Sequence, residues 1–306
     1  MEISTVLAKM AMLVLLMLVG YLCAKLHITG PEFNKRVNPI VLNVLLTATI
    51  LNSVVNAETT LSGTVILEYV GVTTLMLLIL HAVSFFVPKL LRSRGGDVGV
   101  LRMVMSYPNN AFVGFPVVQA VFGTEAVFYA SLSNIPFNTM LYTVGTAILR
   151  GSGEKQKFNW RQLLTMPLIA TFLAVVLFLT HLHVPAVIAD TISTLSAATT
   201  PMSMIVIGTS LGGIPLKKAF GNWRVYVASF VRLIVCPVVV WAVLRLFVHD
   251  PMMLGIPVLL AACPSAMIIT VLCLQYGKDE ALSSEVIFMS TVFSAATIPL
   301  LIWLLL

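Results

Sequence analysis

Ten apolar stretches of roughly membrane-spanning length follow one another along the sequence, with short loops between them. A helix needs about 20 apolar residues to cross the hydrocarbon core of a bilayer. Only 10% of the residues are charged, against about 25% in a typical soluble domain. Because unpaired backbone groups are too costly in lipid, the expected fold is an all-α integral membrane protein. The candidate spans are 3–24, 37–56, 62–87, 99–122, 126–149, 162–182, 191–212, 224–247, 252–276 and 282–305.

The basic residues are concentrated in or beside alternate loops. Of the 18 lysines and arginines, 15 lie on one expected side of the membrane: Lys25, Lys35, Arg36, Lys89, Arg92, Arg94, Arg102, Arg150, Lys155, Lys157, Arg161, Lys217, Lys218, Arg224 and Lys278. The positive-inside rule makes these loops cytoplasmic, so both termini are expected outside the plasma (inner) membrane. Topology therefore accounts for the net charge of +6, and no nucleic-acid partner is expected.

Ten spans divide into two sets of five. We expect a first five-helix repeat over 1–150, a cytoplasmic linker over 151–161, and a second five-helix repeat over 162–306. An odd number of spans in each repeat gives the two repeats opposite orientations in the membrane. Such inverted repeats are common among secondary transporters.

A proline interrupts the fourth span of each half. The two segments read Ser106-Tyr107-Pro108-Asn109-Asn110 and Ala262-Cys263-Pro264-Ser265-Ala266. Each is followed by a glycine and then an acidic residue (Gly123 with Glu125, Gly277 with Asp279). Interrupted helices at matching positions of two repeats indicate a substrate site near the midplane of the membrane.

Proline lacks an N–H group and clashes with the preceding turn, so helix breaks are expected at Pro108 and Pro264. The short polar side chains of Asn109, Asn110 and Ser265 are suited to cap the restarted half-helices. Two helix N-termini facing each other would bind a carboxylate without a buried lysine or arginine. The alternative is two prolines that only kink their helices, but the matching pair beside two asparagines favours a site.

Other polar residues within the spans admit two interpretations. Asn134 and Asn138 are four residues apart and share one helical face, and Asn43 lies in the second span. All three are candidates for hydrogen bonding the substrate or for polar contacts between helices. Gly208 and Gly212 match the GxxxG pattern, which we interpret as close helix packing within the chain.

A few charged or titratable residues also fall within the spans. Lys9 and Arg232 are expected to extend toward the membrane surface, although Arg232 is also a candidate to attract an anion from the cytoplasmic side. Glu68 is a candidate proton or cation carrier, with an interfacial position as the alternative, and Glu285 is similar. His81 is expected to be a polar residue near the cytoplasmic end of its span.

These motifs together resemble the auxin efflux carrier family, which includes plant auxin exporters and bacterial malate and malonate permeases. The resemblance covers essentially the whole chain. It is carried by Gly20-Tyr21, Ile28-Thr29-Gly30-Pro31-Glu32, Val41-Leu42-Asn43-Val44-Leu45-Leu46, the run Ser106 to Pro116, Ala261 to Ala266 with Gly277, and Ser290-Thr291 through Ile298-Pro299. One departure is Thr47, where members often have proline.

The resemblance implies ten helices in two inverted repeats, with the fourth and ninth helices crossing at their prolines in a mobile transport domain. Pro108, Asn109, Asn110 and Pro264 would line this crossover. The first, second, sixth and seventh helices would form a scaffold, and an elevator-type movement would carry the substrate. The family moves organic anions that carry a carboxylate, and the short loops here match its bacterial permeases better than its plant members.

The expected function is therefore secondary active transport of small organic anions, such as malate, malonate or auxin-like acids, by alternating access. The expected partners are the substrate, the lipid bilayer, a coupling ion (protons through Glu68, or sodium) and a second copy in a homodimer through the scaffold helices. A sodium-coupled bile-acid-type symporter is the alternative, followed by a channel or a membrane-embedded enzyme. No HExxH or Asp-rich metal motif is present, and no enzyme activity, cofactor or metal is expected.

Overall fold

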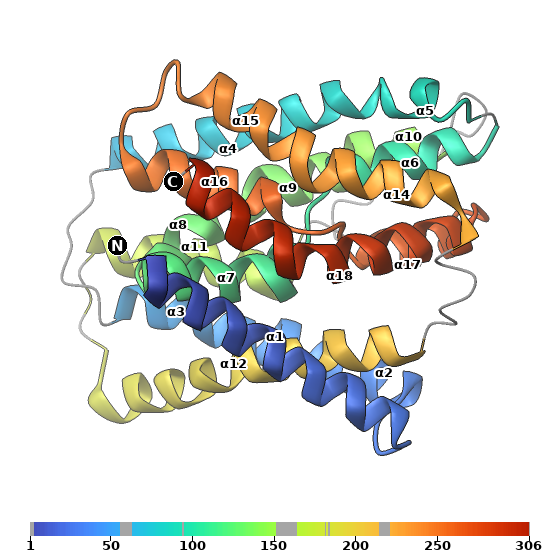
Figure 1. Cartoon of the computed structure of the whole chain (residues 1–306). Helices are drawn as coiled ribbons and strands as arrows, with labels where there is room; N and C mark the ends of the chain where they lie inside the picture. The colour runs from blue at the N-terminus through green and yellow to red at the C-terminus, as the bar shows by residue number, and fades with distance from the viewer. Residues whose placement is uncertain are drawn as a thin grey trace. The chain divides into compact units, whose positions relative to one another are not determined.

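The computed structural model of the chain describes residues 3–55, 63–93, 95–150, 164–180, 182, 184–213 and 221–305 (Figure 1). Within these ranges all regular structure is helical and no β-strand is present. Six helical stretches are long and apolar enough to cross a membrane: Leu7–Lys25, Pro31–Val55, Gly63–Leu90, Ala186–Gly213, Trp223–Leu244 and Glu280–Leu305. The expected all-α membrane fold is thus confirmed. The linker expected at 151–161 lies outside the described residues.

The other four expected spans are made of shorter helices. The fourth, fifth and ninth are each divided, and the helix of the sixth, Met166–Thr180, has 15 residues. The count of ten membrane-crossing helices therefore stays a prediction, although a helix lies within every stretch that the sequence singled out.

The described helices form two compact units, each of which takes residues from both halves of the sequence. This division differs from the expected repeats over 1–150 and 162–306, which stay a prediction. The first unit contains α1 (Ile3–Lys25), α2 (Pro31–Ile40), η1 (Val41–Leu45), α3 (Leu46–Val55), the start of α4 (Gly63–Ser84), most of η2 (Asn110–Gly114), α7 (Phe115–Phe122), α8 (Ala126–Leu132), α11 (Met166–Thr180) and α12 (Ala186–Gly213), where η denotes a π-helix.

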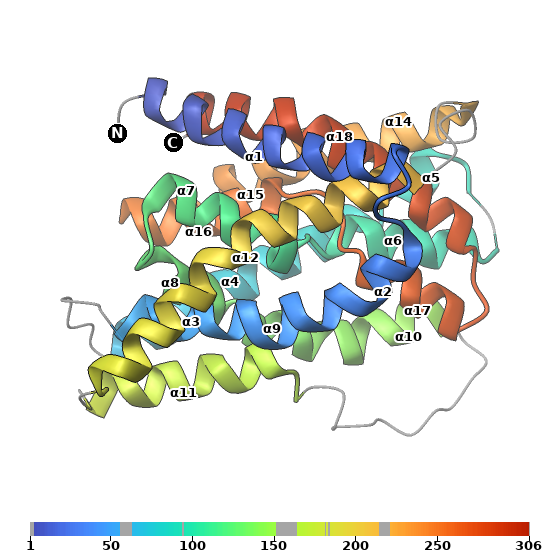
Figure 2. The same cartoon turned by 90° about the horizontal axis from the view of Figure 1, so that it is seen from below.

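Glycines allow α1 and α12 to pack with their backbones in contact (Figure 2). A Cβ atom at Gly208 would overlap the carbonyl oxygen of Met17, and one at Gly20 would overlap that of Ile205. Small residues allow such close approach between helices in lipid. The interpretation of the GxxxG pattern as packing within the chain is confirmed.

Hydroxyl groups add polar contacts inside the first unit. Thr49 Oγ1 donates to Thr199 Oγ1 over 2.6 Å, and Thr199 Oγ1 lies 2.9 Å from the carbonyl oxygen of Leu45, to which it donates. Thr199 in α12 therefore contacts both η1 and α3 and serves helix packing.

The second unit is built around the C-terminal helix. It contains the rest of α4, α5 (Val87–Leu90), α6 (Asp97–Ser106), most of α9 (Asn134–Met140), η3 (Leu141–Gly145), α10 (Thr146–Arg150), α14 (Trp223–Phe230), η5 (Val231–Val235), α15 (Cys236–Leu244), α16 (Pro251–Ala262), α17 (Ile268–Gln275) and α18 (Glu280–Leu305). Within this unit α18 packs against α6, α14, α16 and α17.

The glycine and acid that follow each proline mark a helix end and a new helix start. Gly123 has φ +94° directly after α7, and Gly277 has φ +59° shortly after α17, a region that favours glycine at helix C-termini. Asp279 Oδ1 then accepts a hydrogen bond from the N–H of Leu282 over 3.0 Å at the start of α18. The two glycines and Asp279 therefore have a structural role, whereas Glu125 precedes α8 (Ala126–Leu132) without a side-chain cap hydrogen bond.

Candidate functional site

Both helices are interrupted where the sequence predicts. The first break separates α6, which ends at Ser106, from η2, which begins at Asn110. The second separates α16, which ends at Ala262, from α17, which begins at Ile268. The backbone is extended at the residue after each helix, with φ −116° and ψ 104° at Tyr107.

The two extended segments meet within the second unit as an isolated antiparallel bridge. The N–H of Asn109 donates to the carbonyl of Pro264 over 2.8 Å, and the N–H of Ala266 donates to the carbonyl of Tyr107 over 2.9 Å. Each break therefore satisfies backbone groups that the other leaves unpaired, as lipid-embedded backbone requires. We call this paired region, residues 107–109 with 264–266, the crossover.

Ser265 lies opposite Pro108 in the crossover and satisfies a carbonyl that this proline leaves without a partner. In a regular helix the Val104 carbonyl would accept from the N–H four residues later, but residue 108 is a proline. Ser265 Oγ donates to the Val104 carbonyl instead, over 2.8 Å. The expectation that Ser265 caps its own half-helix is wrong: its hydroxyl closes the end of α6, a chain-distant helix.

Arg232 satisfies a carbonyl at the second break. The Ala261 carbonyl would accept from the N–H of Ser265 in a regular helix, but that N–H donates to Ser290 Oγ over 3.3 Å. Arg232, in η5, donates from Nη1 to the Ala261 carbonyl over 2.9 Å and is fully buried. The expectation that Arg232 extends to the membrane surface is wrong, because the side chain is buried beside the second break.

A buried hydrogen-bond chain supports the first break from the other side. Tyr107 Oη donates to the Met140 carbonyl over 2.7 Å and lies 3.0 Å from His81 Nε2. His81 Nδ1 lies 2.8 Å from the Leu77 carbonyl, so His81 holds α4 and the crossover together. The sequence placed His81 near the end of its span and did not connect it with the crossover.

Three buried polar side chains beside the breaks retain atoms without a hydrogen-bond partner in the described structure. They are the hydroxyl of Ser106, both amide atoms of Asn110, and Nε and Nη2 of Arg232. Buried polar atoms are paired in most proteins, so unpaired groups gathered in one region are candidate ligand contacts.

The remaining candidates are distributed over both units. Asn138 is buried in the second unit. Asn134, which is buried with Nδ2 unpaired, and the exposed Asn43 and Glu68 belong to the first unit. The structure thus brings together Pro108, Asn109, Pro264 and Ser265, with Asn110 next in sequence. Substrate binding by Asn43, Asn134 and Asn138 and proton coupling through Glu68 stay predictions.

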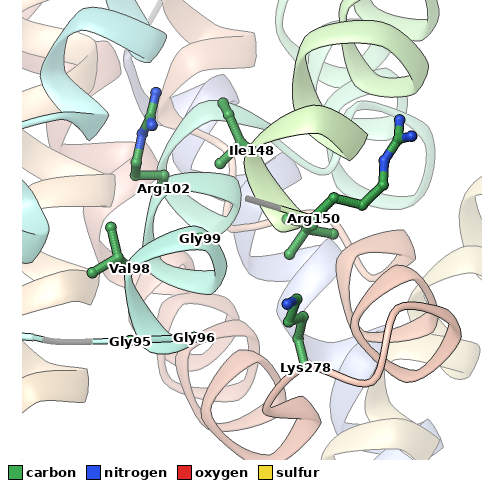
Figure 3. A pocket seen from close by; sticks show the side chains of 9 residues that line it. Gly95, Gly96, Val98, Gly99, Arg102, Ile148, Arg150 and Lys278 are labelled. Atoms are coloured by element: carbon green, nitrogen blue, oxygen red, sulfur yellow. The ribbon is translucent and has the colours of Figure 1, made fainter. Parts of the chain in front are cut away.

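A basic pocket of about 370 Å³ lies at one end of the second unit (Figure 3). Its lining residues are Gly95, Gly96, Val98, Gly99, Arg102, Ile148, Leu149, Arg150 and Lys278. Figure 3 shows the guanidinium groups of Arg102 and Arg150 pointing to different sides, so they do not converge on one point. Arg102 stacks on the Phe85 ring at 3.7 Å and Arg150 faces the Tyr276 ring at 5.7 Å. The pocket is a positively charged surface, and the crossover is the better candidate for the substrate site.

Four loops that the charge pattern assigned to one side of the membrane meet at this end of the second unit. The pocket joins Arg102, Arg150 and Lys278 from three of these loops or their flanks. Arg224, beside the fourth, forms an ion pair with Asp97 over 3.7 Å. This arrangement supports the expected alternation of the spans.

The pocket gives a prediction about anion access. The organic-anion transport expected from the sequence predicts that replacing Lys278 with glutamine lowers the initial rate of anion uptake into proteoliposomes roughly threefold at low ionic strength, because a positively charged surface concentrates anions. The difference should disappear near 0.5 M salt, where charges are screened over about 4 Å. Lys9→Gln, at the exposed start of α1, is the control and should not change the rate. Equal rates for the Lys278 variant and the unmodified protein at low salt would contradict the prediction.

These features define the class of the protein. Membrane-length helices, together with two interrupted helices that pair at their breaks, are typical of multi-pass membrane proteins that transport solutes. Among the described residues, no group of three or more His, Cys, Asp or Glu side chains is placed to hold a metal ion.

Comparison with known proteins identifies the family. Residues 5–302 match the family described as membrane transport protein. The chain belongs to this family, and the resemblance to the auxin efflux carriers is confirmed.

Three relatives align over almost their whole length. An uncharacterized transporter of Methanothermobacter thermautotrophicus is 30% identical over 290 residues, which cover 93% of each chain. An uncharacterized transporter of Methanocaldococcus jannaschii is 29% identical over 301 residues, covering 95% of this chain and 96% of the relative. A protein of Rhizobium meliloti named "Putative malonate transporter" is 26% identical over 301 residues, covering 95% and 92%. The family and these relatives are transporters.

Proposed function

We propose that the chain is a secondary transporter of small organic anions that carry carboxylates, and that it binds them at the crossover. The observation that carries this proposal is the pairing of two proline-interrupted helices through the Asn109 N–H and the Pro264 carbonyl, 2.8 Å apart. Broken helices at matching positions provide the substrate sites of many secondary transporters. The buried Ser106 and Asn110, with unpaired side-chain atoms, supply hydrogen-bonding groups beside the pairing.

Transport by alternating access of two inverted five-helix repeats belongs to the same proposal. It is supported by the matching breaks, by the glycine that follows a helix end and the acidic residue that precedes the next helix in each half, and by the meeting of four expected cytoplasmic loops. An elevator-type movement is implied by the family resemblance. The first unit contains the helices of expected spans 1, 2, 6 and 7, which the resemblance assigns to the scaffold, together with the start of α4 and with α7 and α8 from expected spans 4 and 5.

Malonate is the first substrate to test, because one relative is named for its transport. The expected result is uptake into proteoliposomes that saturates with concentration and is accelerated by unlabelled malonate inside (counterflow). A carrier saturates because each turnover requires a conformational change, whereas a channel conducts without counterflow. Proteoliposomes without protein are the control. Absence of saturable uptake across malonate, malate, succinate and indole-3-acetate would contradict the proposal.

The coupling ion is tested in the same preparation. Accumulation driven by an inward proton gradient would support proton coupling, for which Glu68 is the expected carrier. A strict requirement for external sodium would instead support the bile-acid-type alternative. From the charge pattern we propose that the protein lies in the plasma membrane with both termini outside. From the resemblance we propose that it assembles as a homodimer through the scaffold helices.

A further inference from the structure

Arg232 is a buried cation that lacks an acidic partner. Its side chain is fully buried in η5, and Nη1 donates to the Ala261 carbonyl over 2.9 Å. Nε and Nη2 have no hydrogen-bond partner, and the described residues place no carboxylate within ion-pair distance of the guanidinium. The thiols of Cys236 and Cys263 interact with its charge, and the Cys236 thiol also contacts the guanidinium as a weak hydrogen-bond partner without a negative charge of its own.

A buried positive charge without an acidic partner is stabilised by binding an anion. Burying an ion without a counter-charge is strongly unfavourable, and an arginine cannot escape this cost by losing its proton. The C-terminal end of α16 and the Ala261 carbonyl offset part of it, because the carbonyl end of a helix carries partial negative charge. The end of a helix supplies no full negative charge, so part of the free-energy cost of burying the guanidinium remains until an anion binds.

The unpaired atoms have the geometry that a carboxylate needs. Nε and Nη2 lie on one edge of the planar guanidinium, and such an edge donates two parallel hydrogen bonds to the two oxygens of a carboxylate. Nη1, on the other side, fixes the group to the last turn of α16. The side chain is thus held by one nitrogen and offers a bidentate edge with the others.

The position of Arg232 in the fold links it to the proposed substrate site. Ala261 directly precedes the break that contains Pro264 and Ser265, and all these residues belong to the second unit with Arg232. Arg232 is therefore one hydrogen bond from the helix end that forms half of the crossover.

We propose that the Nε–Nη2 edge of Arg232 binds a carboxylate of the transported anion. This proposal rests on the proposed function and adds the residue that makes the site select acids over neutral solutes. Arg232 is closed off from solvent in this structure, so the carboxylate reaches it in the conformation that opens the crossover.

The test is equilibrium binding of radiolabelled malonate to purified protein. In Arg232→Gln the dissociation constant is expected to rise on the order of a hundredfold, as when one partner of a buried charge pair is removed. In Arg232→Lys it should rise about tenfold, because an ammonium keeps the charge but loses the bidentate edge. Arg245→Gln, which removes an exposed charge from the end of α15, is the matched control and should bind as the unmodified protein does.

A second measurement separates binding from helix stabilisation. The ligand-free melting temperature of Arg232→Gln should stay equal or rise, because an unpaired buried charge is removed. A dissociation constant within about twofold of the unmodified protein, with a lower melting temperature, would reduce Arg232 to a structural cap of α16 and overturn the proposal. If the glutamine variant does not fold, unchanged binding by Arg232→Lys overturns it equally. Failure of the unmodified protein to bind any of the four acids named above would instead contradict the proposed function.

Discussion

Replacing Gly208 with alanine is expected to lower the free energy of unfolding by about 3 kcal/mol or more, the upper range for overpacked sites. The added Cβ would overlap the carbonyl oxygen of Met17, which is a backbone atom and cannot rotate away. The backbones of α1 and α12 must therefore separate, and the contacts along both helices weaken together. In lipid this loss is severe, because helix association depends on close packing rather than on the hydrophobic effect.

The same helix offers a matched control. Gly213 lies five residues beyond Gly208 in α12, and a Cβ placed there would meet nothing within 4 Å. Gly213→Ala should therefore change stability by less than about 0.5 kcal/mol. Thermal unfolding of the purified proteins in detergent measures both. Equal melting temperatures for the two variants would show that α1 and α12 do not approach as closely as described. Gly20→Ala, which would overlap the Ile205 carbonyl, should behave like Gly208→Ala.

The crossover shows which parts of this structure can be predicted from the sequence. The breaks at Pro108 and Pro264 were predictable, because the missing N–H is a local property of proline. The pairing of the breaks depends on contacts between distant segments: Ser265 and Val104 are 161 residues apart. A local motif suggests that Ser265 caps the next helix, and only the tertiary fold reveals the competing carbonyl of α6.

Arg232 illustrates a second limit. A helix that is apolar all round carries no stripe that shows which face is turned inward. The residues next to Arg232 are valine, leucine and isoleucine, and the small Ser229 and Cys236 on its helical face are a weak sign of a side chain that faces α16 and not lipid. An ionisable residue within a span is by default a functional candidate, and this signal was available. The position of Arg232 two turns into its span favoured extension to the surface instead, and the structure contradicts that interpretation.

Replacing Asn110 with alanine is expected to raise the KM for malonate by about tenfold to a hundredfold. A hydrogen bond from a neutral amide to a charged ligand contributes about 1.5–3 kcal/mol to binding. Losing this free energy corresponds to the tenfold to hundredfold rise in KM. Asn110 is 3% exposed and begins the half-helix after the first break, with both amide atoms unpaired. The Asn110 amide is buried without a hydrogen-bond partner in the described structure, and a bound ligand can supply that partner.

The stability of Asn110→Ala should not fall together with its transport. Alanine removes a buried amide that makes no hydrogen bond, so the free energy of unfolding is expected to stay equal or rise. Thr297→Val in α18 is the matched control, because Thr297 Oγ1 is also buried and unpaired but lies in an uninterrupted part of the second unit. It should alter neither KM nor folding. Uptake kinetics and thermal unfolding of the same preparations test both expectations. Loss of stability in Asn110→Ala with an unchanged KM would assign this side chain to packing and remove it from the substrate site.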